Sequence, residues 1–167
     1  MSRRWAVALG LGTESMRANV DGSPTLAVAT VELSGRFRIR PAIEIALSLG
    51  GGGAYYGSFS TSSIMADFRY RFLAEQSLNV YALAGLGIGS ASAKDPTDIE
   101  KKGRGSFRIG GGGELRFDPL AVYAEMRLYG IGENKEVPDT VPPTTRYQLA
   151  RFGVSGIALV LGATWYF

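Results

Sequence analysis

The sequence predicts an all-β fold: an eight-stranded antiparallel up-and-down transmembrane β-barrel forming a single domain over residues 1–167. Three observations lead to this prediction. Apolar and polar residues alternate with a period of two in one segment after another, as in strands with one apolar and one polar face. The connections between these segments are alternately short and long, and aromatic residues recur beside the short ones. No segment keeps a helical period over three turns, so helical and α/β folds are poor alternatives.

The first predicted strand is Arg4–Thr13, in which Trp5, Leu9 and Leu11 share one phase. The stretch Met1–Gly12 also has the two arginines and short apolar run of an export signal. Its apolar part alternates large and small residues, and no small-x-small cleavage site follows at the usual distance. We therefore prefer a strand, with Met1 standing where a removed signal or a preceding segment used to be.

The alternation is clearest in Glu32–Arg40, where Leu33, Phe37 and Ile39 are separated by charged residues and serine. The same pattern predicts further strands at Ala42–Ser48, Ile64–Phe72, Phe107–Phe117, Val122–Leu128, Leu78–Ser90 and Gln148–Phe167. The segment Leu78–Ser90 contains no charged residue that would fix its phase. We predict that its even-numbered residues, from Val80 to Ile88, face outward, and the opposite phase is the alternative.

The connections divide into two groups. Short turns are predicted at Arg40-Pro41, Leu73–Ser77 and Asp118-Pro119, and long loops at Glu14–Pro24, Gly50–Ser62, Ala91–Gly105 and Gly132–Tyr147. In transmembrane barrels the short turns are periplasmic and the long loops extracellular. Both termini are therefore expected in the periplasm.

The aromatic residues indicate which face meets lipid. A soluble lipocalin-like barrel would have the same alternation with its apolar face inside. A bilayer interface instead selects aromatic residues at one height. We predict a girdle on the periplasmic side made of Trp5, Phe37, Phe72, Phe117, Trp165 and Phe167. Candidates for a second girdle are Tyr55, Tyr56, Phe59 and Phe107.

The polar face would then enclose the lumen, which side chains can fill in a barrel of eight strands. An arginine facing lipid at mid-membrane would cost about 2–4 kcal/mol, whereas an inward arginine can pair with an acid. Gly110 and Gly112 are expected to leave room for the guanidinium groups. The predicted lumen charge network consists of Glu32, Arg36, Arg38, Glu44, Asp67, Arg69, Arg108, Glu114, Arg116, Glu125 and Arg127.

The last strand carries a family resemblance. Its residues Ile157, Leu159, Leu161, Trp165 and the final Phe167 resemble the C-terminal signature of bacterial outer-membrane proteins. With its strand number and loop alternation, the chain resembles the small eight-stranded outer-membrane barrels of the OmpA and OmpX type. This resemblance implies that Trp165 and Phe167 are an assembly signal for the barrel-assembly machinery and that periplasmic chaperones escort the chain.

Composition bounds the chemistry. The chain has no Cys and no His, and its net charge of +3 is scattered, so nucleic-acid binding is not expected. Barrels resembling lipid A deacylases or acyltransferases would need a His with a Ser. We therefore expect no enzyme, no catalytic residue, no cofactor and no metal. Glu114 and Glu125 are interpreted as partners of arginine rather than glycosidase acids. Asp95, Asp98 and Glu100 lack the spacing of a calcium loop.

Three functional interpretations remain after these exclusions. The preferred one is an integral outer-membrane barrel, surrounded by lipid, that acts as a structural or surface-interaction protein and displays its long loops to an unknown partner. The alternative is a narrow gated pore for water or small ions, whose charges would rearrange to open it. A soluble ligand-binding barrel is the less favoured third interpretation.

Overall fold

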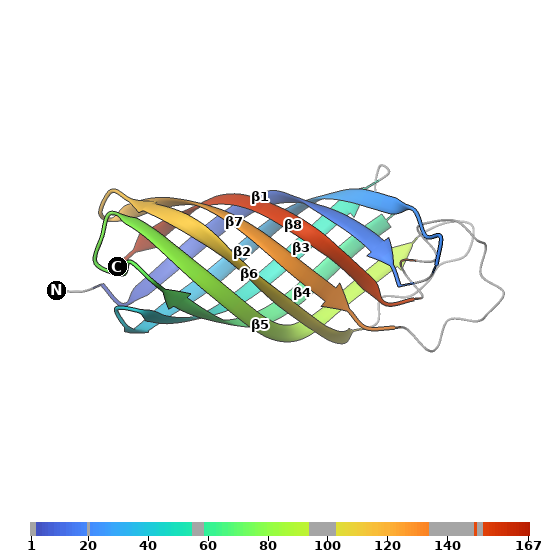
Figure 1. The fold of residues 1–167 in the computed structure, drawn as a ribbon, viewed down its shortest axis with the longest axis horizontal. Coiled ribbons are helices and arrows are strands. Elements are labelled where there is room, and N and C mark those ends of the chain that lie inside the picture. The colour runs from blue at the N-terminus through green and yellow to red at the C-terminus, as the bar shows by residue number, and fades with distance from the viewer. Residues whose placement is uncertain (1–2, 20, 55–58, 94–102, 134–148, 150–151) are drawn as a thin grey trace.

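Eight antiparallel strands form a closed barrel in the computed structural model, which describes residues 3–19, 21–54, 59–93, 103–133, 149 and 152–167. Each strand pairs with its neighbours in the sequence, and the first pairs with the last (Figure 1). The predicted up-and-down barrel is confirmed. The strands are β1 (Trp5–Ala18), β2 (Thr25–Arg40), β3 (Ile43–Ala54), β4 (Phe59–Arg71), β5 (Leu78–Ala93), β6 (Arg104–Arg116), β7 (Leu120–Ile131) and β8 (Val154–Tyr166).

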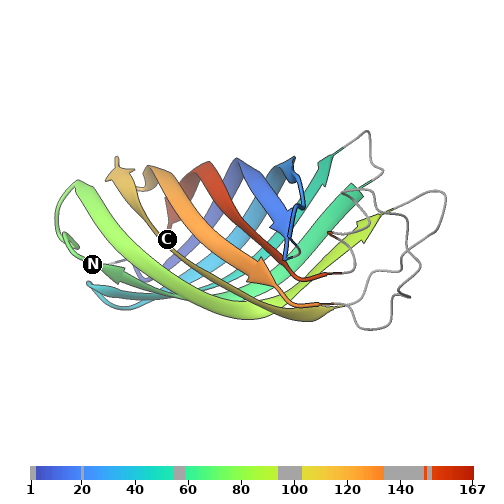
Figure 2. The same cartoon turned by 45° about the vertical axis from the view of Figure 1, so that its right-hand side comes forward.

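The two ends of the barrel differ. At the end that we call the turn end, β2–β3, β4–β5 and β6–β7 are joined by residues 41–42, 72–77 and 117–119. Both termini also lie at this end (Figure 1), where Phe167 N donates a hydrogen bond to Trp5 O at 2.9 Å. The strand ends that the other connections join lie at the opposite end, the loop end. The strands cross the barrel obliquely and the sheet closes without a free edge (Figure 2).

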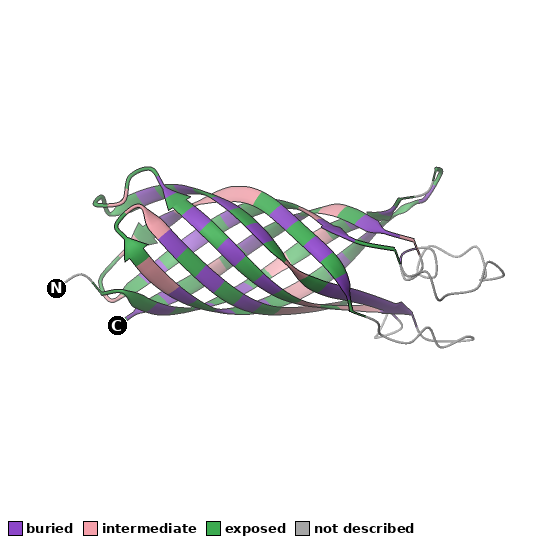
Figure 3. Ribbon diagram, turned by 90° about the horizontal axis from the view of Figure 1, so that it is seen from below, coloured by how far each residue is buried: buried purple, intermediate pink, exposed green. Residues whose placement is uncertain are grey.

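Burial alternates along most of each strand (Figure 3), so that one set of side chains faces outward and the other fills the interior. In β5 the outward set is the even one, as predicted: Leu86 is 72% exposed, whereas Tyr81 and Leu83 are buried. The exposed outer face is an apolar belt of Leu, Ile, Val, Phe and Trp. The outer face is therefore apolar where a soluble lipocalin-like barrel would have its polar face. No helix among the described residues is long and apolar enough to cross a membrane.

The strands run further toward the loop end than predicted. Three predicted loops are wrong at their edges: Glu14–Pro24, Gly50–Ser62 and Ala91–Gly105. The strand β1 continues to Ala18, β3 to Ala54 and β5 to Ala93. In addition, β4 already begins at Phe59 and β6 at Arg104. The hydrogen-bond ladder between strands does not need apolar side chains outside, so it continues past the last residues of the belt. Most of the predicted loop Gly132–Tyr147 lies outside the described residues.

The polarity of the wall reverses at the loop end. In β1, Thr13, Ser15 and Arg17 are exposed, whereas Met16 and Ala18 are buried in the interior. Buried apolar residues from several strands meet there in a cluster that we call the apolar cap: Met16, Ala18, Leu26, Val28, Phe59, Ala91, Ala93, Ile131, Leu149 and Val154. Beyond the belt, the barrel therefore has the polar outside and apolar inside of a soluble protein.

Phe59 belongs to this cap and is fully buried, so the prediction that it joins a second aromatic girdle is wrong. It has the same phase as Met65 and Asp67, which also face inward. Phe107 does lie on the outer face, half exposed. Tyr55 and Tyr56 are outside the described residues.

Candidate functional site: the charged lumen

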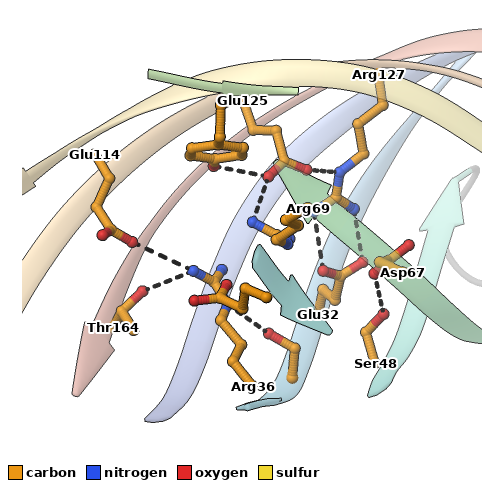
Figure 4. A network of polar contacts seen from close by, with 12 residues as sticks. Glu32, Arg36, Ser48, Asp67, Arg69, Glu114, Glu125, Arg127 and Thr164 are labelled. Carbon is orange, nitrogen blue, oxygen red and sulfur yellow. Dashed lines mark hydrogen bonds and ion pairs between the residues drawn. The ribbon is translucent and has the colours of Figure 1, made fainter. Parts of the chain in front are cut away.

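The interior between the turn end and the apolar cap is filled by arginines and carboxylates in three layers, which confirms the predicted polar, salt-bridged interior (Figure 4). These residues face inward because they occupy the inward phase of β2, β3, β4, β6 and β7.

The first layer lies nearest the turn end and is centred on Glu114. This carboxylate accepts hydrogen bonds from Arg71 Nη1 at 2.8 Å and Arg116 Nε at 2.9 Å. It also accepts bonds from Tyr166 Oη at 2.7 Å and from Arg36 Nη1 at 3.4 Å. The second guanidinium nitrogen of Arg71 donates to Glu44 Oε2 at 2.6 Å. One carboxylate is therefore shared by three arginines.

The middle layer is centred on Glu125. Its Oε2 lies 3.0 Å from Arg69 Nη1, and both side chains are fully buried. Tyr81 Oη donates to the same oxygen at 2.8 Å, while Arg127 Nε donates to the other carboxylate oxygen. The Arg69 guanidinium also lies over the Tyr81 ring, 5.1 Å from its centroid. Ion pairing and the ring together offset the cost of burying this arginine.

The third layer joins Glu32 and Asp67 through arginines. Arg127 donates to both oxygens of Glu32, at 2.6 and 2.9 Å, and Arg108 Nη1 donates to the same carboxylate at 2.5 Å. Arg108 also forms a bidentate pair with Asp67, whose Oδ2 accepts a further bond from Ser48 Oγ. Because Arg127 bonds to both Glu32 and Glu125, the middle and third layers form one network (Figure 4).

The predicted lumen residues all lie at interior positions of the barrel, with one difference in their pairing. Arg38 has no ion pair within the described part of the chain, and it lies over the ring of Tyr166, 5.0 Å from the centroid. Arg116 is paired but partly open, with 18% of its side chain exposed. Both lie at the mouth of the lumen at the turn end.

Sequence reasoning missed several members of the network. Arg71 was left out of the predicted network, although the alternation in Ile64–Phe72 places it on the same polar face as Asp67 and Arg69. Tyr81, Tyr123 and Tyr166 also fill the lumen. A tyrosine fits either face of a strand in the alternation, so its inward position shows only when neighbouring charges fix the phase.

The inward glycines make room for tyrosines and neighbouring backbone rather than for guanidinium groups, which corrects the prediction for Gly110 and Gly112. A Cβ on Gly112 would lie 2.8 Å from Tyr81 Oη, and one on Gly110 would collide with the backbone of Met126. Tyr123 similarly lies against Gly162 of β8. Glycine is required at these positions because the ring or the adjacent strand occupies the space of a Cβ.

A cavity of about 50 Å³ separates the third layer from the apolar cap. Glu14, Glu32, Arg108, Tyr129 and Ile131 are among its lining residues. It has room for a few water molecules, and Glu14, Glu32, Arg108 and Tyr129 on its wall are polar groups that could bind them. On one side this cavity ends at the ion pairs of Glu32, and on the other it ends at the buried apolar side chains of the cap.

The arrangement of acids does not form a metal centre within the described residues, where no group of three possible ligands gathers. Asp95, Asp98 and Glu100 are outside the described part of the chain. Glu114 and Glu125 each accept bonds from at least two cationic or phenolic donors. Their geometry is that of structural ion pairs.

The predicted girdle residues lie on the outer face near the turn end. Trp5, Phe72, Phe117, Trp165 and Phe167 are more than half exposed. Phe37 is partly buried because its ring packs against that of Trp5, with centroids 4.6 Å apart. Strand register places Trp165 opposite Leu120 on β7 and Val7 on β1.

Comparison of the sequence with protein-family models and with curated proteins gives no match. Solved structures, however, have the same fold. Neisserial surface protein A has a TM-score of 0.76 at 17% identity, covering 98% of this chain and 97% of that one. For Ail, the attachment invasion locus protein of Yersinia pestis, the TM-score is 0.60 at 17% identity, with 100% of both chains covered.

The outer-membrane enzyme PagL is also similar, with a TM-score of 0.53 at 14% identity over 94% of this chain and 97% of that one. At these identities the likeness concerns the fold. The chain thus has the fold of the small eight-stranded outer-membrane β-barrels, which its C-terminal strand and loop alternation predict.

Proposed function

We propose that this chain is an integral outer-membrane barrel with a closed interior, acting as a structural or surface-interaction protein that displays the loop-end connections to a partner. The observation that carries the proposal is the sealed lumen. Ion pairs between fully buried side chains fill it from the turn end, and the apolar cap covers them at the loop end. A pore would have to break these pairs in a medium of low dielectric constant, where an unpaired charge is costly.

The outer face of the barrel supports its proposed position in the outer membrane. The apolar belt would contact lipid, and Trp5, Phe72, Phe117 and Trp165 would lie at the periplasmic interface, where aromatic rings are favoured. Because the last strand resembles the C-terminal signature of outer-membrane proteins, Trp165 and Phe167 would be recognised by the barrel-assembly machinery after periplasmic chaperones deliver the chain. The names of Neisserial surface protein A and Ail, a surface protein and an attachment protein, are consistent with the proposed display role.

The proposal does not include catalysis. PagL shows that this fold can carry an enzyme, so the argument comes from the residues. The chain lacks histidine, which is the usual general base, and the buried acids Glu114 and Glu125 are held by arginine and tyrosine.

Reconstitution in planar bilayers tests the closed lumen. We expect no discrete conductance steps, because the lumen is filled by ion pairs and capped by apolar residues. A large porin reconstituted in the same way provides the positive control. Stepwise openings whose size or frequency changes with Glu44→Gln or Arg127→Ala would instead support the narrow gated pore.

Epitope insertion tests the orientation. A tag inserted at Gly22, between β1 and β2, should bind antibody on intact cells. A tag inserted after Glu75, between β4 and β5, should bind only after the outer membrane is permeabilised. Both residues are exposed on connections between strands, so the two insertions perturb the barrel similarly. The reverse labelling pattern would place the termini outside and refute the proposed orientation.

A further inference from the structure

The mouth of the lumen at the turn end is hollow and rich in arginine. A cavity of about 190 Å³ there is lined by Arg3, Arg38, Arg116, Asp118, Leu120 and Tyr166. It lies on the turn-end side of Glu114 and Tyr166, and is therefore separate from the cavity beneath the apolar cap.

Positive charge at this mouth is incompletely neutralised. Glu114 is shared by Arg36, Arg71 and Arg116, and Glu44 is bonded to Arg71. Arg38 forms no ion pair among the described residues, although Glu44, which is bonded to Arg71, lies opposite it on β3. The layer therefore has more guanidinium groups than carboxylates, unlike the middle and third layers, where each arginine has its own carboxylate bond.

The hydrogen-bond donors show the same deficit. Nε and Nη2 of Arg38 and Nη2 of Arg116 are buried without an acceptor in the described structure. The two guanidinium groups lie over the same ring, at 5.0 and 5.6 Å from the Tyr166 centroid. Two like charges held beside one ring repel each other, and buried donors without acceptors are costly. Asp118, the acid of this cavity, is already bonded to Arg3 at 3.0 Å and is largely exposed.

We propose that this mouth binds a phosphate group, in which Arg38 and Arg116 are the principal ligands and Arg3 is the outer one. A phosphate monoester carries up to two negative charges and several acceptor oxygens, which match two planar guanidinium donors. Its charge would remove the repulsion between the two arginines. The source of the phosphate is either a soluble ester from the turn-end side or a lipid headgroup, because Leu120 at the rim also lies on the lipid-facing surface.

The test uses the full chain refolded in neutral detergent micelles, with inorganic phosphate as the probe. Phosphate should raise the urea midpoint of unfolding above its value in chloride at equal ionic strength. Arg38→Gln should lower the apparent affinity about tenfold or more, since it removes a charged donor set. Arg38→Lys should lower the apparent affinity for phosphate by a smaller factor, because lysine keeps the charge but lacks the planar guanidinium fork.

Arg40→Gln is the matched control, because Arg40 lies on the same strand and at the same end but is exposed and does not line the cavity. It should retain the full phosphate effect. Equilibrium dialysis with labelled phosphate gives the affinity directly, so the result does not depend on the stability of the variants. An equal phosphate effect in Arg38→Gln and Arg40→Gln would show an adventitious ionic effect and overturn the proposal. The absence of any effect in the wild type, both with inorganic phosphate and with the phospholipid described next, would also overturn it.

A second arm distinguishes the two sources. Micelles doped with phosphatidic acid present the phosphate monoester on a lipid, and micelles doped with phosphatidylcholine are the control. Stabilisation by phosphatidic acid alone, lost in Arg38→Gln, would assign the site to a lipid headgroup. Stabilisation by inorganic phosphate alone, lost in the same variant, would assign it to a soluble phosphate ester.

Discussion

Replacing Glu114 with Gln should lower the free energy of unfolding by about 3–5 kcal/mol, the usual cost of removing one partner from a buried ion pair. Glu114 is fully buried and accepts bonds from Arg36, Arg71, Arg116 and Tyr166. An amide has nearly the same shape as the carboxylate but no charge. The variant would leave the surrounding guanidinium groups with Glu44 as the carboxylate of their layer.

Urea unfolding of the refolded protein in lipid vesicles measures this effect. Glu75→Gln is the matched control, since Glu75 is exposed in the turn before β5. It should change the free energy of unfolding by less than about 0.5 kcal/mol, as is typical of surface sites. The double variant Glu114→Gln with Arg71→Gln should be less destabilised than the sum of the single variants, because the charge left unpaired is also removed. A loss for Glu114→Gln as small as that of Glu75→Gln would show that the layer is hydrated and its ion pairs contribute little.

The alternation of residues predicted the strands and their facing because both depend on local properties. A strand such as Glu32–Arg40 has its charges two residues apart, and a shift of one residue would turn all of them toward lipid. The middle of each strand was therefore predictable. For Leu78–Ser90, where charges are absent, the alternation left both phases possible, and the structure has the even residues, among them Leu86 and Ile88, on the outer face.

The strand ends were less predictable because the wall reverses its polarity at the edge of the belt. In β1 the apolar residues change from the odd positions of Leu9 and Leu11 to the even positions of Met16 and Ala18. In β2 the change falls between Val28, which is buried, and Val31, which is exposed. A search for one continuous phase interprets this change as the end of the strand, although it marks the edge of the membrane.

The pairing within the lumen could not be predicted from alternation at all. Arg36 on β2 bonds to Glu114 on β6, across the barrel, so the pair depends on how far the strands are staggered. The alternation says that both side chains face inward but not that they lie at the same height. The same holds for Arg38, which has the phase of the network but lies at its open end.

Replacing Leu9 with Arg on the outer face of β1 should destabilise the barrel by about 2–4 kcal/mol, the cost of an arginine facing lipid at mid-membrane. Leu9 is half exposed, and its register partners on the neighbouring strands are Leu33 and Ala163, so no carboxylate lies opposite it. Urea unfolding in vesicles with bilayers of defined thickness measures the change. In neutral detergent micelles, which deform more easily than a bilayer, we expect a smaller loss.

Ser15→Arg provides the matched control, because Ser15 faces outward on the same strand but lies beyond the apolar residues, beside the native Arg17. The cost of an outward arginine falls to about 0–1 kcal/mol near the interface. A large difference between the two variants would place the membrane boundary between Leu9 and Ser15, the stretch in which the wall reverses its polarity. Equal small costs for both would mean that the outer face of β1 is not embedded in lipid, and equal large costs would mean that the bilayer extends over the apolar cap.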